Sequence, residues 1–351
     1  MAHYILKRLL LMIPTLFGVL LITFAVTQFV PGGPVEQLVH QLQHGGREGG
    51  EASVGAEGMY RGAQGLDEER LAEIRAFYGF DKPAHERFLD MLGNYLTFDL
   101  GESYFQHQSV LGLMADKLPV SISLGMWTFL LTYLISIPLG VRKAVRDGTP
   151  FDIWTTSLLL VGYAIPGFVL GLFLLVLFGG GSFWDVFPLR GLVSDNWAEL
   201  SWPARIGDYL WHMVLPVTAM VVGNFAVMTL LTKNSFLEEI RKQYVLTARA
   251  KGLSENQVLY GHVFRNAVIP LVTGFPAAFI GAFFTGSLLI ETLFSLDGLG
   301  LLSYEAVLQR DYPVVLGTLY IYTLLGLVAK LLTDLSYAWV DPRIQFGAVN
   351  R

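Results

Sequence analysis

Residues 119–141 read PVSISLGMWTFLLTYLISIPLGV, a run without a single charged side chain. A helix needs about 20 predominantly apolar residues to cross the hydrocarbon core of a bilayer. The run therefore predicts a transmembrane helix. Five more runs meet the same requirement, and they occupy residues 9–30, 153–178, 211–231, 268–290 and 313–336. We predict an all-α polytopic membrane protein with six transmembrane helices.

The composition of the 351-residue chain excludes a soluble globular protein. Hydrophobic residues make up 53% of it, charged residues only 15%, and the mean hydropathy is +0.50. Soluble domains are about 45–50% apolar and about 25% charged. The chain has no cysteine, which rules out disulfides, thiolate metal sites and a cysteine nucleophile.

The first apolar run follows Lys7 and Arg8, as a secretory signal would. It is too long for the apolar region of a signal, and no small-x-small cleavage site precedes residues 31–34. We expect a retained helix.

Lysine and arginine in short loops set the orientation of a membrane protein. With the N-terminus inside, the inner segments hold 13 of these residues and the two short outer segments hold three. The inner segments are residues 1–8, 142–152, 232–267 and 337–351. The bias predicts a multi-pass protein with both termini in the cytoplasm.

These spans suggest four parts: an N-terminal transmembrane helix (1–30), a periplasmic segment (31–118), a five-helix core (119–338) and a cytoplasmic tail (339–351). Within the periplasmic segment, residues 31–66 are rich in glycine and predict a flexible loop.

Residues 67–118 predict a small helical cap. Apolar residues recur there at helical spacing from Asp67 onward, and a second helix is expected near Pro83 with Phe88, Leu92 and Leu96 on one face. Within the spans lie Pro14, Pro138, Pro166 and Pro276. Static kinks explain such prolines better than hinges, because neighbouring groups in a bundle take up the freed carbonyls.

The sequence shows no catalytic set. No Gly-Lys dipeptide occurs, so a Walker A phosphate loop is absent, as are His-Glu-x-x-His and Gly-x-Ser-x-Gly. His40 and His44 are four apart but lie in the glycine-rich loop, where a preformed metal site is not expected. We predict a chain with no ATPase site, metal or cofactor of its own.

The loop 232–267 is the strongest functional candidate, because it is long, basic and helical in pattern. Residues 244–254 read YVLTARAKGLS. Gly252 is placed to end one helix and Ser254 to begin the next, with Gln257 at the capping-box position. The pattern predicts a helix–turn–helix elbow. An ordinary basic loop that only sets topology is the alternative, and composition alone does not decide between them.

Spacing favours the elbow. Ala248, Ala250 and Gly252 occupy every second position, and Pro270 follows Gly252 by eighteen residues. This arrangement resembles the cytoplasmic "EAA" loop of ABC importer permeases, and the surrounding residues resemble its oligopeptide/dipeptide branch. Thr247 stands where the wider superfamily often has glutamate, a departure that is usual within the peptide branch.

The resemblance covers almost the whole chain. The segments that carry it are residues 1–34, 81–83 (DKP), 98–103 (FDLGES), 136–140 (SIPLG), 291–300 (ETLFSLDGLG), 310–313 (RDYP) and 341–343 (DPR). Finer features look like the Yej-type permeases, and they are residues 60–62 (YRG), 187–193 (FPLRGLV), 231–236 (LTKNSF) and 241–244 (RKQY). Yej-type permeases belong to a bacterial importer of peptides and of the peptide-nucleotide antibiotic microcin C.

The resemblance implies a type I ABC permease fold in the bacterial inner membrane. It implies a homologous second permease, two cytoplasmic ABC ATPase subunits or domains that use ATP and magnesium, a periplasmic solute-binding protein and a peptide substrate, with no nucleic acid involved. The residues it assigns to coupling with the ATPase are Tyr244, Thr247, Ala248, Arg249, Ala250, Lys251 and Gly252. Arg249 and Lys251 are expected to add charge pairing with the ATPase.

The same branch points to polar positions of the fourth and fifth spans as a translocation path, namely Asn224, Thr229 and Thr285. Glu291, at the outer end of the fifth span, is expected to help form the outer gate of this path. Intramembrane hydroxyls and amides also serve simply to join helices, and Glu291 is alternatively a water-exposed end residue. In the sixth span Lys330 and Asp334 are four apart, which favours mutual pairing or snorkelling.

Other functions stay open from the sequence. A permease of the same branch for dipeptides, nickel or oligosaccharides would share these motifs. An ion-coupled secondary transporter would need charges buried mid-span and often has inverted repeats, and neither is evident. A membrane-anchored receptor would not need the elbow.

Overall fold

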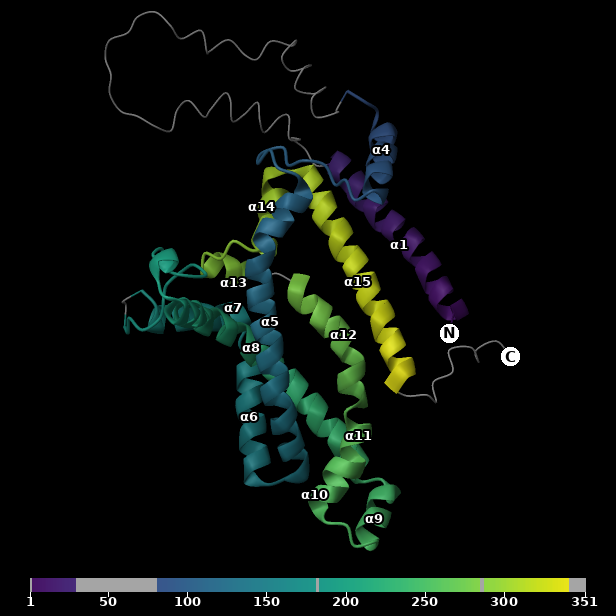
Figure 1. Cartoon of the computed structure of the whole chain (residues 1–351), viewed down its shortest axis with the longest axis vertical. Coiled ribbons are helices and arrows are strands. Elements are labelled where there is room, and N and C mark those ends of the chain that lie inside the picture. The colour runs from purple at the N-terminus through teal and green to yellow at the C-terminus, as the bar shows by residue number, and fades with distance from the viewer. Residues whose placement is uncertain (1, 30–80, 181–182, 285–286, 341–351) are drawn as a thin grey trace, which may run out of the picture. The chain divides into compact units, whose positions relative to one another are not determined.

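The computed structural model describes residues 2–29, 81–180, 183–284 and 287–340. Every regular element in these ranges is a helix (Figure 1). The chain forms two compact units. One comprises Met1–Leu9, Lys117–Leu302 and Leu325–Arg351, and the other comprises Leu10–Asp116 and Ser303–Leu324. The expected helix from Asp67, the whole glycine-rich loop and most of the tail lie outside the described residues.

Among the described residues, four helices are long and apolar enough to cross a membrane. They are α1 (Ala2–Phe29), α5 (Val110–Val145), α8 (Trp202–Ile240) and α15 (Tyr312–Val340). Two bent helix pairs raise the number of candidate spans to six. The first pair is α6 (Pro150–Ala164) with α7 (Gly167–Phe178), and the second joins α10 (Glu255–Val258) and α11 (Phe264–Ala267) to α12 (Ile269–Phe284). The predicted all-α polytopic fold is confirmed.

Shorter elements connect these helices. They are α4 (Ala84–Leu96), the 3₁₀ turn Trp197–Glu199, α9 (Gln243–Ala250), the π-helical turn Leu259–Val263, α13 (Leu288–Leu293) and α14 (Leu299–Gln309). The long helices extend beyond the apolar runs. α5, for example, begins at Val110, where the Ser109 hydroxyl accepts a hydrogen bond from the Gly112 amide (3.1 Å). Hydropathy marks the part of a helix that lipid covers, whereas capping groups set where it begins.

The third predicted span is broken at Pro166, where α6 and α7 meet at 93° (Figure 1). Ile165, the residue before the proline, has an extended conformation (φ −87°, ψ 119°), because the proline ring disfavours the helical region for its predecessor. By contrast, Pro14, Pro138 and Pro276 lie inside continuous helices. The expected kink at Pro166 is therefore a complete break.

In the second unit, α4 begins directly after Pro83, as predicted. Phe88 packs its ring against Phe24 (centroids 5.2 Å apart), and Tyr95 packs against Tyr320 (5.1 Å). The apolar face predicted for this helix is wrong at Leu96, which is 83% exposed. The buried residues Phe88 and Tyr95 are seven apart, two full helical turns, so their stripe leaves Leu96 outside it.

Two motifs distant in sequence meet in this second unit. Asp311 is buried, and its carboxylate accepts hydrogen bonds from the Ser103 hydroxyl and the Tyr104 amide (3.2 Å). Burial raises the pKa of the Asp311 carboxyl, while these hydrogen bonds act in the opposite direction. The contact joins residues 98–103 to residues 310–313, two of the segments that carry the family resemblance.

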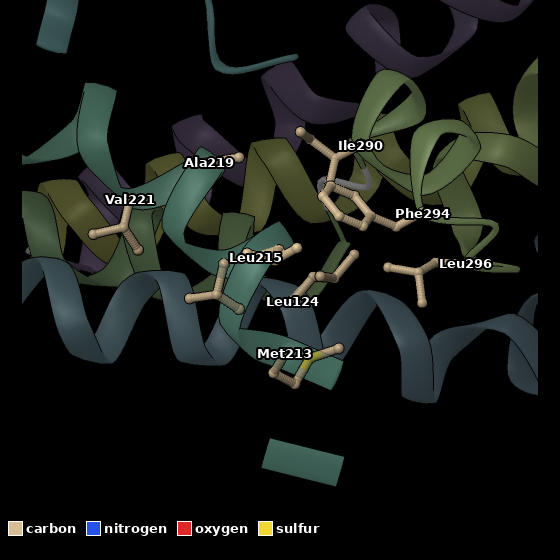
Figure 2. Close-up of a cluster of buried hydrophobic side chains, with 9 residues drawn as sticks. Leu124, Met213, Leu215, Ala219, Val221, Ile290, Phe294 and Leu296 are labelled. Atoms are coloured by element: carbon tan, nitrogen blue, oxygen red, sulfur yellow. The ribbon is translucent and has the colours of Figure 1, made fainter. Parts of the chain in front are cut away.

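The core of the first unit packs α5, α8 and the segment around α13 together (Figure 2). Ile290 and Phe294 from the α13 segment lie against Leu124 of α5 and the apolar side chains of α8 in this cluster. The remaining members are Met213, Leu215, Val217, Ala219, Val221 and Leu296. This core fixes the walls of the cavity described below.

Candidate functional site

The predicted elbow is present. Its first arm is α9, which presents Val245 and Ala248 to the interior, where both are buried. They pack in a cluster with residues of α5, α8 and the second arm, namely Val141, Ala144, Phe236, Val258, Val263 and Ala267. Ala248 is thus an anchoring residue of the elbow and not part of its outer surface.

Gly252 forms the turn of the elbow. Its φ is +83°, in the left-handed region that side-chain-bearing residues avoid, and its amide donates to the Arg249 carbonyl (2.9 Å). No atom would lie within 4 Å of an added Cβ, so the requirement for glycine is conformational and not steric. The second arm begins at Ser254 with the predicted capping box, in which the Ser254 amide donates to Gln257 Oε1 (2.9 Å).

Tyr244 holds the elbow to the helices behind it. Its hydroxyl donates to Glu239 Oε2 at the end of α8 (2.8 Å) and accepts from Asn266 Nδ2 in α11 (3.2 Å). Burial raises the pKa of the Tyr244 hydroxyl, which stays a protonated donor at physiological pH. Tyr244 therefore links α8, α9 and α11.

The outward face of α9 carries Leu246, Thr247, Ala250 and Lys251, all of which are exposed. We define these four as the elbow face. Leu246, at 58% exposure, was missed by the sequence analysis. The available signal was its place four residues before Ala250, which puts both on the helix face opposite Val245 and Ala248.

Arg249 does not contribute a spare charge to this face. Its Nε and Nη2 atoms donate to the two carboxylate oxygens of Glu255 across the turn, both at 2.9 Å. The expected pairing of Arg249 and Lys251 with charges of the ATPase stays a prediction. The Arg249–Glu255 pair closes the two arms on each other.

A cavity of about 660 Å³ lies at the break between α6 and α7. Asn224 of α8 is on its wall, where its Nδ2 donates to the Met220 carbonyl (3.0 Å). The described lining carries no charged side chain, and its polar side chains are those of Tyr163, Asn224 and Ser287. Residues at the break, from Ile165 to Phe168, line this space together with residues of α8.

The other predicted path residues lie elsewhere. Thr229 is fully buried where α8 crosses α5 at Gly140, whose added Cβ would lie 2.8 Å from the Thr229 carbonyl oxygen. In this conformation Thr229 is a packing residue. Thr285 lies outside the described residues.

Glu291 is fully buried, so the alternative of a water-exposed end residue is wrong. Its carboxylate accepts from the Ser287 amide (3.0 Å) and the Leu301 amide (2.8 Å). Burial raises the pKa of Glu291, against the backbone hydrogen bonds that lower it. An added Cβ on Gly298 would lie 2.6 Å from the carboxyl carbon. Glu291 thus braces the loop beside the cavity wall.

Asp334 pairs with a different partner from the one expected. Its carboxylate lies 2.7 Å from Arg8 Nη2 and accepts from the Tyr4 hydroxyl (2.8 Å). Lys330 is exposed. The proposed Lys330–Asp334 pair is replaced by a contact between the first and last spanning helices, which no local spacing reveals.

These features belong to a known class of protein. Residues 136–346 match the model of the binding-protein-dependent transport system inner membrane component, a region that contains the elbow and the cavity. The chain belongs to this family and is a permease subunit of an ABC importer. The ion-coupled secondary transporter considered above is thereby excluded.

The relatives extend the likeness to the whole chain. It is 57% identical to the peptidoglycan transport system permease protein YejB of Agrobacterium fabrum, over 99% of each chain. It is 55% identical to the inner membrane ABC transporter permease protein YejB of Escherichia coli O157:H7, again over 99% of each. The dipeptide transport system permease protein DppB of Escherichia coli K12 is more distant, at 32% over 98% of this chain and 99% of that one.

Proposed function

We propose that this chain is one of two related permeases in an inner-membrane importer of peptides, including peptide-nucleotide conjugates of the microcin C kind. Two cytoplasmic ABC ATPases hydrolyse ATP with magnesium, and a periplasmic solute-binding protein delivers the substrate. The support is the identity of 55–57% to Yej-type permeases together with the more distant dipeptide permease.

The single observation that carries the coupling role is the construction of the elbow. An exposed face with one large apolar side chain, Leu246, stands on a helix whose opposite face is fixed by buried Val245 and Ala248. A rigidly mounted helix transmits displacement, whereas a flexible loop absorbs it. The elbow face docks in a groove of the ATPase, and closure of the ATPase moves α8. The larger number of Lys and Arg residues in the segments on the side of the elbow supports a cytoplasmic position for the elbow and for both termini.

The cavity at the α6–α7 break forms this chain's half of the translocation path, and the second permease completes it. The described residues that line this cavity carry no charge, which suits substrates whose side chains vary in charge. Asn224 presents an amide to the cavity, a group that can both donate to and accept from a peptide backbone.

Replacement of Leu246 by aspartate tests the coupling role. The variant should no longer co-purify with the ATPases and should not transport, because a carboxylate would be buried in the interface without a partner. Leu89→Asp is the matched control, since Leu89 is 63% exposed on α4, a helix of the second compact unit. A Leu246→Asp variant that binds the ATPases as the control does would refute the docking face.

The substrate is tested in cells lacking this subunit. We expect loss of uptake of defined oligopeptides and resistance to microcin C, both restored by the intact chain. Uptake of a dipeptide and of a peptidoglycan-derived peptide is measured as well, to define the range of substrates. Unchanged oligopeptide uptake, with loss of nickel or oligosaccharide uptake instead, would replace the peptide assignment with an alternative of the same branch.

A further inference from the structure

Lys143, at the end of α5, is fully buried. Its Nζ lies 3.0 Å from Asp152 Oδ1 and donates to the Asp152 carbonyl (2.8 Å) and to the hydroxyls of Thr155 and Thr156 (2.7 Å each). A basic residue that serves only to set the orientation of a helix in the membrane does not need to be buried. The neighbouring Arg142 and Arg146 are examples, because both side chains are exposed.

The contacts of Lys143 continue as a chain of alternating charge. Asp152 Oδ2 is 2.6 Å from Lys233 Nζ of α8, and Lys233 is in turn 2.9 Å from Asp147 Oδ1. Arg241, which ends α8, lies 3.4 Å from Asp147 Oδ2. We call these five residues the charge clamp. All of them belong to the first compact unit.

The charge clamp ties two places together. One is the turn between α5 and α6 with the first turn of α6, which carry Asp147 and Asp152 in that order. The other is the C-terminal end of α8, which carries Lys233 and is capped by Arg241. Arg241 is two residues before α9, the first arm of the elbow. A force applied to the elbow face therefore reaches the end of α8 at the point where the clamp attaches the second and third spans.

We propose that the charge clamp is a set of positioning residues for energy coupling: it makes α5 and α6 move with α8 when the ATPases displace the elbow. The proposal rests on the proposed function of the elbow. A buried ion pair is costly to assemble and weak evidence for stability as such. Buried charges of fixed geometry do, however, hold elements in one register, which is what transmission of a displacement requires.

The test uses the complete transporter in proteoliposomes and measures peptide transported per ATP hydrolysed. Asp147→Asn removes the link to Lys233 and Arg241 but leaves Asp152 paired. We expect this ratio to fall at least about fivefold, a typical coupling effect, with the ATPases still bound. Asp147→Glu keeps the carboxylate and should restore the ratio. Asp90→Asn is the matched control, because it breaks the exposed Lys82–Asp90 pair.

A covalent cross-link in place of the Asp147–Arg241 ion pair distinguishes a role in transmitting displacement from a role in stability. Because the chain has no cysteine, Asp147→Cys with Arg241→Cys gives its only two thiols, which a short bismaleimide can join. The double variant should couple poorly before cross-linking and recover afterwards. The cross-linking experiment also tests the proposal if the Asp147→Asn variant assembles badly.

The proposal for the charge clamp is refuted if the Asp147→Asn variant transports as much peptide per ATP as the Asp90→Asn variant. It is equally overturned if the cross-link raises thermal stability and leaves the transport ratio low. Failure of the elbow proposal has a different signature, since Leu246→Asp would then retain the ATPases whatever the clamp variants do.

Discussion

At the scale of single residues, Gly252 carries a requirement that only the backbone reveals. Gly252→Ala puts a Cβ on a left-handed residue, which costs roughly 1–2 kcal/mol. We expect the turn to loosen and transport per ATP to fall while assembly persists. Gly93→Ala is the control, because Gly93 lies within α4 with open space at its Cβ. Equal transport by the two variants would show that the turn has no part in coupling.

Two buried carboxyl groups predict a pH dependence. Burial raises the pKa of Glu291 and of Asp311 in the folded protein. A raised pKa means that the folded state binds the proton more readily, so this contribution to stability is present at low pH and is lost as pH rises through the folded pKa. Thermal unfolding in detergent from about pH 4 to pH 7 should show it. Glu291→Gln with Asp311→Asn should flatten the profile, and an unchanged slope would contradict the assignment.

At the scale of elements, the break at Pro166 gives two polar residues of α8 different roles. Asn224 faces the cavity, whereas Thr229 is buried where α8 meets α5. Asn224→Ala should change the relative uptake of different peptides by a few-fold, since one hydrogen bond contributes about 1 kcal/mol. Thr229→Ala should alter thermal stability and leave the uptake spectrum unchanged. A spectrum altered by Thr229→Ala alone would reverse the two roles.

Features with local causes were predictable from the sequence. Apolar run length located the spans, and the Ser254–Gln257 capping box was read from spacing alone. The pairing of Asp334 with Arg8, near opposite ends of the chain, was not predictable. The burial of Glu291 was missed for a related reason, because one of its two amide partners, Leu301, belongs to the next helix, α14. Charges counted as topology signals, such as Lys143, depend on tertiary partners for their role.

At the scale of the whole molecule, the proposed orientation has a direct test. Since the chain has no cysteine, Ala250→Cys and Leu89→Cys each supply one thiol, and both positions are exposed. A membrane-impermeant maleimide should label Leu89→Cys in cells whose outer membrane is permeabilised. Ala250→Cys should react only in inverted inner-membrane vesicles. Labelling of Ala250→Cys from the periplasmic side would reverse the topology.

The Arg249–Glu255 pair has a further consequence for how the subunits stay attached. Because the arginine charge is neutralised within the elbow, the elbow face offers one lysine beside an apolar side chain. Added salt screens attraction between exposed charges, with a Debye length of about 3 Å at 1 M, but does not weaken apolar contacts. The ATPases should therefore remain bound through a high-salt wash of the membranes.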